Sequence, residues 1–292
     1  MRKLGLVFCL LLAGCAAKKQ PVAATPAPIR SQLPPATAEI IEHCVITKQE
    51  NANTVTCSCL PTTTVIDSKT GHTTLVCKRP LTIAGHKLDC THPDTPEPLG
   101  PAAALAYSCN SYFTSVVKRL TSEQLRDSFV RAGFGSVTHL EPNEASGSVA
   151  LAPSPEELQL QAIGEWGVSV TPLELASAYR ALALLSQKNS DAKVTALLFE
   201  GLQGSVSYGM AHAAQPASPI KVAGKTGTAP ADEGSWTHGW FAGYAPAENP
   251  TFVVAVFLEK GHGSDAAVLA SKMFEAVAES RDEHLATVGS QR

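Results

Sequence analysis

The residues with the clearest chemical potential lie in one short run near the end of the chain. Lys225, Thr226, Gly227 and Thr228 follow Val222-Ala223-Gly224, a pattern that predicts an edge strand with glycines where another backbone can approach closely. An ammonium group and two hydroxyls along one rim suit a carboxylate, and a peptide laid beside the strand could pair with it through backbone hydrogen bonds. The run therefore predicts a site for the carboxylate end of a peptide. A glycine-containing turn between strands is the plain alternative.

Two further runs lie in the middle of the chain. Ser108-Cys109-Asn110 stands between two segments of helical pattern, and Gly164-Glu165-Trp166-Gly167 is followed by Thr171-Pro172-Leu173-Glu174-Leu175-Ala176. With the lysine run, these stretches resemble the second motif (Ser-x-Asn), the Gly-x-Gly segment and the third motif of penicillin-binding protein transpeptidase domains. Their order and flanks agree over roughly residues 102–279.

The resemblance implies a set of site residues. Ser108, Asn110 and Lys225 match catalytic positions of the family, and Lys225, Thr226, Gly227 and Thr228 match its substrate-binding strand. The implied ligands are a peptidoglycan stem peptide or a β-lactam, without a cofactor or a metal.

The first motif of the family has no clear counterpart. Active members carry a Ser-x-x-Lys turn, in which a neutral lysine takes the serine proton as the serine attacks a D-Ala-D-Ala carbonyl. The best match here is Pro34-Pro35-Ala36-Thr37-Ala38-Glu39, which places Ala36 at the nucleophile and Glu39 at the general base. A methyl group cannot be acylated, so this register predicts a catalytically silent domain.

Three other stretches fit Ser-x-x-Lys literally, and they leave a displaced catalytic pair open. They are Ser115 to Lys118, Ser190 to Lys193 and Ser218 to Lys221. Their order relative to the other motifs differs from that of the family, and Ser108 relays protons in relatives without being the nucleophile.

The N-terminus predicts export and lipidation. Arg2 and Lys3 precede an apolar run, and Leu12-Ala13-Gly14-Cys15 has the form of a lipobox. We expect a signal peptide over residues 1–14, a lipid on Cys15 and a Pro/Ala-rich tether over residues 15–35. The chain would then be anchored to a membrane of the bacterial cell envelope and face the periplasm, with the inner or outer membrane left open.

Six further cysteines lie close together in the sequence. In an oxidising compartment an even number of cysteines predicts up to three disulfides, and a zinc site is the alternative because His43, His72, His86 and His92 lie among them. The spacing lacks a paired CxxC pattern, so we expect no metal. The six are Cys44, Cys57, Cys59, Cys77, Cys90 and Cys109.

Charge and pattern set the expected architecture. The net charge of −3 argues against a nucleic-acid partner, which favours a basic face. Residues 36–284 are expected to form one α+β, transpeptidase-like domain, with a cysteine-rich segment (36–100), a helical lobe (101–212), and strands with a C-terminal helix (218–284). The antiparallel sheet would comprise residues 220–228, 239–244 and 251–259. A sheet truncated at its N-terminal strands, or supplemented by strands from residues 45–80, is left open.

The motifs support three functions from different classes. The leading hypothesis is a lipid-anchored domain that binds stem peptide or a cell-wall protein without acyl-enzyme chemistry. The alternatives are an active serine D,D-transpeptidase or carboxypeptidase with a displaced nucleophile, and a purely structural lipoprotein.

Overall fold

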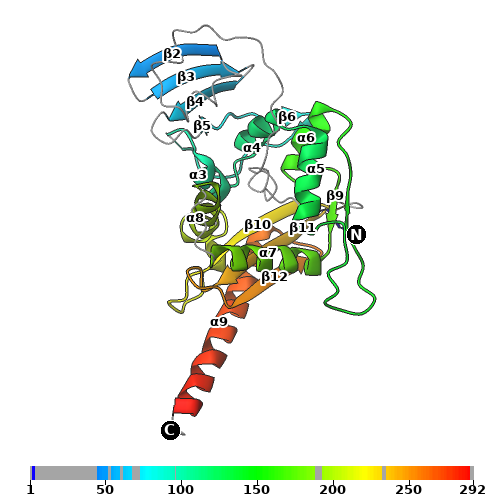
Figure 1. Ribbon diagram of the computed structural model, residues 1–292, viewed down its shortest axis with the longest axis vertical. Coiled ribbons are helices and arrows are strands. Elements are labelled where there is room, and N and C mark those ends of the chain that lie inside the picture. The colour runs from blue at the N-terminus through cyan, green and yellow to red at the C-terminus, as the bar shows by residue number, and fades with distance from the viewer. Residues whose placement is uncertain are drawn as a thin grey trace.

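A three-stranded antiparallel sheet supports the C-terminal half of the fold (Figure 1). The computed structural model describes residues 2–3, 45–51, 54–59, 62–67, 73–95, 97–187, 193–231 and 235–289. The sheet is ordered β10 (Ala223–Pro230), β11 (Thr237–Ala245) and β12 (Phe252–Leu258). Eight of the nine residues of β11 are buried, as expected of a central strand, and β10 lies at an edge as the glycine-rich sequence predicts.

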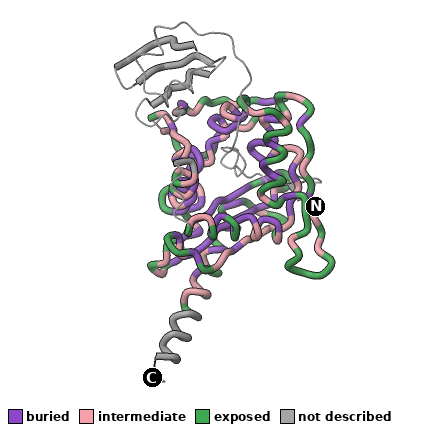
Figure 2. Tube along the Cα trace, viewed as in Figure 1, coloured by how far each residue is buried: buried purple, intermediate pink, exposed green. Residues whose placement is uncertain are grey.

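The two faces of this sheet carry different helices. Helices α7 (Pro172–Ser186) and α8 (Lys193–Ser207) pack on one face, and α9 (Gly263–Gly289) packs on the other (Figure 1). Because side chains alternate along a strand, Trp240 joins the core beneath α7, while Phe241 packs edge-on against Phe274 of α9. Figure 2 shows the sheet buried between these layers.

A lobe of shorter helices precedes the sheet in the chain. It comprises α3 (Pro101–Ala106), α4 (Asn110–Val116), the 3₁₀ turn η1 (Val117–Arg119), α5 (Ser122–Arg131) and α6 (Pro155–Ala162), while a second 3₁₀ turn, η2 (His212–Ala214), leads toward β10. Helix α5 begins at a capping box, in which Thr121 and Gln124 satisfy each other's backbone N–H groups. Helix α7 begins in the same way at Thr171 and Glu174. The spacing of Thr121 and Gln124 in the sequence predicts the first start, and Pro172 at a first helical position predicts the second.

The remaining strands form separate small sheets. Strands β2 (Val45–Asn51), β3 (Thr54–Cys59), β4 (Thr62–Asp67) and β5 (Thr73–Leu75) make an antiparallel sheet of their own. The sequence left open that strands from residues 45–80 extend the main sheet, and that alternative is wrong. Strands β6 (Thr82–Ile83) and β7 (His86–Lys87) pair with each other, and β9 (Val168–Val170) lies between β1 (Arg2–Lys3) and β8 (Ser148–Val149).

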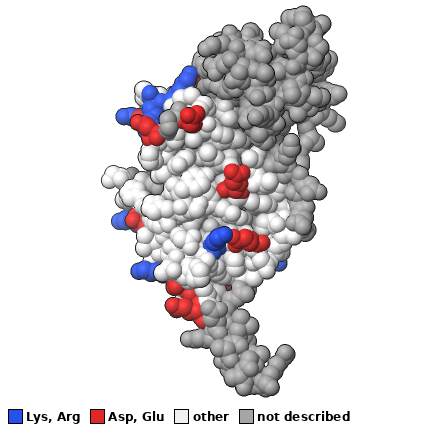
Figure 3. All heavy atoms as spheres, turned by 90° about the vertical axis from the view of Figure 1, so that its left-hand side faces the viewer, with Lys and Arg blue, Asp and Glu red and all other residues white. Residues whose placement is uncertain are grey.

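The α+β class, the antiparallel sheet and the helical lobe expected from the sequence are all present. The sequence predicts a C-terminal helix from about Asp265 to Glu279, and α9 extends further, to Gly289. The sequence did not anticipate α6, β8 and β9. Within the described ranges, no helix combines the length and the apolar character needed to cross a membrane. The face turned to the viewer in Figure 3 carries scattered charges of both signs between broad uncharged areas.

Candidate functional site

One cavity of about 450 Å³ brings the second and third motifs together. Ser108 lines it from the turn between α3 and α4, Asn110 from the first position of α4, and Thr226, Gly227 and Thr228 from β10. These residues are more than 100 positions apart in the sequence, so the fold itself creates the site. The other lining residues are Lys87, Leu88, Asp89, Thr91, Ile163, Glu165, Met210, His262, Gly263 and Ser264.

Ser108 is placed by a left-handed turn at the end of α3. Its φ angle is 55°, a conformation that non-glycine residues seldom adopt. The backbone N–H of Cys109 donates to the carbonyl of Ala104 at 2.9 Å, which closes the turn in the manner of a helix C-cap where glycine is usual. A serine held in this conformation at a cavity wall is a feature typical of functional sites.

Asn110 is fixed by the opposite wall of the cavity. Its Nδ2 group donates a hydrogen bond to the backbone carbonyl of Leu88 at 3.1 Å. That bond ties the start of α4 to the segment after β7 and sets the orientation of the amide. The Asn110 Oδ1 atom is thereby directed away from Leu88.

The threonines of β10 are held by the elements next to the strand. The Oγ1 atom of Thr228 accepts a hydrogen bond from the N–H of Gly263, the first residue of α9, at 2.9 Å. A Cβ atom on Gly263 would lie 2.8 Å from the carbonyl oxygen of Gly227, so this close approach requires glycine. The start of α9 therefore forms one rim of the cavity.

Lys225 faces the other side of the sheet from these threonines. It lies opposite Ala242, which belongs to the core under the helical lobe, whereas Thr226 lies opposite Phe241 on the α9 side. The expectation that the ammonium and the hydroxyls share one rim is therefore wrong, because strand alternation separates them. Lys225 is only 2% exposed and is not among the residues that line the cavity.

The burial of Lys225 changes its chemistry. Its Nζ atom donates a hydrogen bond to the carbonyl of Thr226 at 2.9 Å. Removal from water disfavours the charged form and lowers the pKa of Lys225 to about 7. A substantial fraction of this amine is therefore neutral near neutral pH, which is the protonation state that a proton acceptor needs.

The first-motif residues Ala36 and Glu39 lie outside the described residues, as does Ser190. The other displaced pairs do not meet the cavity. Ser115 and Lys118 are on α4 and η1 and do not line it, and Lys221 forms an ion pair with Glu248 at 2.9 Å. Ser218 donates its backbone N–H to Glu275 and is also absent from the lining.

Several cavity residues were not foreseen from the sequence. One wall is formed by the end of β7 and the segment after it (residues 87–91), and one rim is formed by His262 and the first residues of α9. Neither segment carries a motif. Ile163 and Glu165 lie within or directly beside the Gly164–Gly167 run that the sequence singles out, so that signal could have identified both as lining residues.

The cysteines differ from the expected disulfide framework. Cys77, Cys90 and Cys109 are free thiols, and the sulfur atoms of Cys90 and Cys109 are 3.8 Å apart, far beyond the bond length of about 2.05 Å. Cys44 and the side chains of Cys57 and Cys59 lie outside the described part. The three free thiols lie instead beside His92, in a group that has the ligand types of a metal site.

The cavity and its two motifs on an α+β scaffold define a transpeptidase-type domain. The family model for the penicillin-binding protein transpeptidase domain matches residues 62–279. Because that match covers about three-quarters of the sequence, the chain belongs to this family. The match begins after Ala36 and Glu39 and includes Ser108, Asn110 and the β10 motif.

One curated relative supports the assignment to this family. The chain is 26% identical over 229 residues to peptidoglycan D,D-transpeptidase MrdA of Acinetobacter baumannii, with 59% of this chain and 33% of that protein covered. It therefore spans about a third of the length of this curated relative.

Solved structures share the fold. A penicillin-binding protein 2 in complex with MreC from Helicobacter pylori has a TM-score of 0.59 at 22% identity, covering 68% of this chain and 43% of that chain. The imipenem acyl-enzyme complex of penicillin-binding protein A from Mycobacterium tuberculosis has a TM-score of 0.57 at 23% identity, covering 68% of this chain and 53% of that chain. At these identities the likeness concerns the fold.

Proposed function

We propose that this transpeptidase-family domain binds a peptidoglycan stem peptide in the cavity without forming an acyl-enzyme. The observation that carries the proposal is the composition of the cavity: the second and third motifs meet there, and neither Ser115 with Lys118 nor Ser218 with Lys221 reaches it. In the family register the nucleophile position is Ala36. Binding groups are thus retained, while a Ser-x-x-Lys pair at the cavity is not found in the described part of the chain.

The polar groups of the cavity suit a peptide end. Asn110 offers an amide whose Nδ2 is already bonded to Leu88, and the hydroxyl hydrogen of Thr228 is free to donate because its oxygen accepts from Gly263. The ammonium of Lys87 lies on a side chain that is 78% exposed, beside Asp89 at 3.4 Å. Such a mixture of donors and one cation fits an amide and a terminal carboxylate.

Two measurements test this proposal. The full chain, purified in detergent, is first incubated with fluorescent penicillin and run on a denaturing gel, where we expect no covalent band. Calorimetry with a stem peptide ending in D-Ala-D-Ala should then give saturable binding that weakens at least about tenfold in Asn110→Ala and Thr228→Ala, the loss of one well-placed hydrogen bond. Ser115→Ala, on the same helix as Asn110 but away from the cavity, is the matched control. Absence of binding in the unaltered protein would favour the structural lipoprotein.

An active D,D-transpeptidase or carboxypeptidase is the second candidate, and one observation favours it. Ser108 lies at the cavity in a left-handed conformation. If penicillin does form a covalent band, Ser108→Ala should abolish it, whereas Ser218→Ala should not. Ser264, which also lines the cavity, should be substituted as well, together with Ser115 and Ser190 of the other Ser-x-x-Lys stretches.

The cellular setting follows from the N-terminal sequence. We propose that Cys15 carries a lipid that holds the domain at a membrane of the bacterial cell envelope, facing the periplasm. Metabolic labelling with a clickable fatty acid should mark the wild-type chain but not Cys15→Ser. The H. pylori relative was solved with MreC, which supports a cell-wall protein as a second kind of ligand for this domain.

A further inference from the structure

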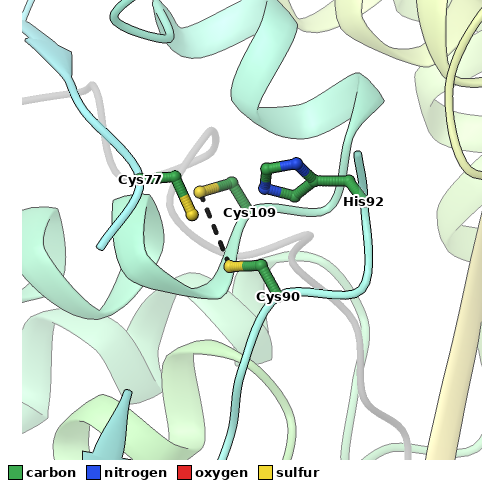
Figure 4. A group of neighbouring side chains, drawn as sticks. All are labelled: Cys77, Cys90, His92 and Cys109. Atoms are coloured by element: carbon green, nitrogen blue, oxygen red, sulfur yellow. Dashed lines mark hydrogen bonds between the residues drawn. The ribbon is translucent and has the colours of Figure 1, made fainter. Parts of the chain in front are cut away.

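Four side chains from three separate segments converge beside the cavity (Figure 4). Cys77 follows β5, Cys90 and His92 follow β7, and Cys109 lies in the turn between α3 and α4. One potential ligand atom from each lies within 4.8 Å of every other. Three of the four residues are buried and Cys77 is half-buried, so three sulfurs and one imidazole share a site with little access to water.

The spacing of the sulfurs fits a tetrahedral metal better than a disulfide. In a tetrahedral zinc site with Zn–S bonds of about 2.3 Å, two sulfurs stand roughly 3.8 Å apart. The sulfur atoms of Cys90 and Cys109 are 3.8 Å apart. A disulfide would require them to approach to about 2.05 Å and would leave Cys77 as an unpaired thiol.

His92 is oriented as a metal-binding histidine. Its Nδ1 atom is 2.7 Å from the carbonyl oxygen of Pro93 and 3.3 Å from Nη2 of Arg79. The carbonyl can only accept and the guanidinium can only donate, so the shorter contact assigns the hydrogen to Nδ1. Nε2 is then a lone-pair acceptor, and it is buried without a hydrogen-bond partner. Figure 4 shows a ring nitrogen of His92 turned toward the sulfurs. Metal-bound histidines characteristically donate their other nitrogen to a carbonyl or carboxylate, and a metal ligand role accounts for the orphaned Nε2.

Hydrogen-bond donors and one cation lie close to the sulfur atoms. The backbone N–H groups of Ser111 and Tyr112 hydrogen-bond to the sulfurs of Cys90 and Cys109, and the guanidinium of Arg79 hydrogen-bonds to Cys77 and donates to the carbonyl of His92. Three thiolates with one divalent ion leave a single negative charge, which the Arg79 cation offsets.

We propose that Cys77, Cys90, His92 and Cys109 are the four protein ligands of a structural zinc ion. Soft thiolates with one imidazole select zinc over magnesium or calcium, and four protein ligands close the tetrahedron, which is typical of a structural and not a catalytic zinc. The ion would join the segment after β5, the wall of the cavity after β7, and the turn that carries Ser108 and Asn110. It would thus act as a clamp on the second motif, independently of what the cavity binds.

The test measures metal content in the full chain, purified in detergent under non-reducing conditions and loaded with zinc chloride. We expect one zinc ion per chain by elemental analysis. Cys77→Ser and His92→Ala should lower zinc affinity by more than about 100-fold in a chelator competition, since even second-shell changes cost about 10- to 100-fold. Cys59→Ser on β3 and the exposed His86→Ala on β7 are the matched controls, and both should retain full zinc content.

A second measurement applies to the unaltered chain, in case a variant fails to fold. Cobalt(II) in place of zinc should give the intense visible bands of a tetrahedral thiolate complex. A weak octahedral spectrum would overturn the proposal. So would zinc binding that survives both Cys77→Ser and His92→Ala, or a Cys90–Cys109 linked peptide found by mass spectrometry in protein that binds no zinc.

Discussion

Because Lys225 is buried, we expect its charge to destabilise the folded domain, even though the residue belongs to the third motif. Replacing this lysine by methionine should stabilise the folded domain at low pH. The side chain is 2% exposed, and its pKa falls from an ordinary value of 10.5 to about 7 because burial disfavours the charged form. That difference corresponds to up to about 5 kcal/mol of folding free energy that the charged lysine costs.

The sign of the pH dependence follows from linkage. Between about pH 7 and pH 10.5 the unfolded chain holds the Lys225 proton and the folded chain does not, so the free energy of unfolding rises with pH in this window. The cost is fully present below pH 7 and is gone above pH 10.5. Methionine keeps the apolar stem and loses the hydrogen bond to Thr226, worth about 1 kcal/mol. We expect Lys225→Met to be more stable by about 2–4 kcal/mol at pH 6 and no more stable than the wild type at pH 10.

Urea unfolding followed by tryptophan fluorescence at pH 6, 8 and 10 measures this difference directly. Lys221→Met is the matched control, because Lys221 lies close in the sequence with a side chain that is 72% exposed and paired with Glu248. Its effect should stay within about 1 kcal/mol at every pH. A Lys225→Met effect that is equal at pH 6 and pH 10, or destabilising at pH 6, would refute the reasoning.

Three further substitutions test the scaffold by urea unfolding. Thr121→Ala removes the capping box of α5 and should cost about 1 kcal/mol, with unchanged stability refuting the cap. Glu174→Gln replaces a buried carboxylate that accepts from the backbone of Gly147 and of other loop residues, and should cost roughly 2–4 kcal/mol. Gly239→Ala places a Cβ 2.3 Å from the carbonyl oxygen of His262 and should cost about 1–3 kcal/mol; a neutral effect would contradict that close approach.

The parts of the fold that could be predicted are those encoded locally. The capping-box spacing at Thr121 and the proline at position 172 mark two helix starts, and both helices begin where these signals place them. The apolar runs of β11 and β12 likewise mark their strands within about two residues. Each of these signals depends on neighbours in the sequence, so a single chain is enough to interpret it.

The composition of the site was harder to predict because it is non-local. The wall after β7 and the rim at Gly263 reach the cavity only through packing, and no motif marks them. The orientation of Lys225 is different, since the two-residue period of a strand already separates it from Thr226. Lys225 is an odd number of residues away from Thr226 and Thr228, so its ammonium and their hydroxyls point to opposite faces of the strand.

The cluster of Cys77, Cys90, His92 and Cys109 is a second non-local feature that the sequence did not predict. The spacing from Cys77 to Cys90 and Cys109 has no paired CxxC pattern, which is why the sequence favours disulfides over a metal. Loops after β5 and β7 and the turn before α4 nevertheless bring three sulfurs and His92 together. Ligand sets drawn from three separate segments have no fixed spacing, so only the tertiary structure reveals them.

The second motif and the cysteine cluster share a single turn of the chain. Cys109 lies between Ser108 and Asn110, so the interactions that hold its sulfur also fix the two residues on either side of it, which line the cavity. The left-handed conformation of Ser108 costs free energy that the surrounding structure must offset. A turn closed by the Cys109 N–H bond, tied to Leu88 through Asn110, and anchored at the Cys109 sulfur has the means to do so. Pre-organisation of this kind favours ligand binding as much as catalysis, because a groove that is already ordered loses less entropy when a peptide enters it.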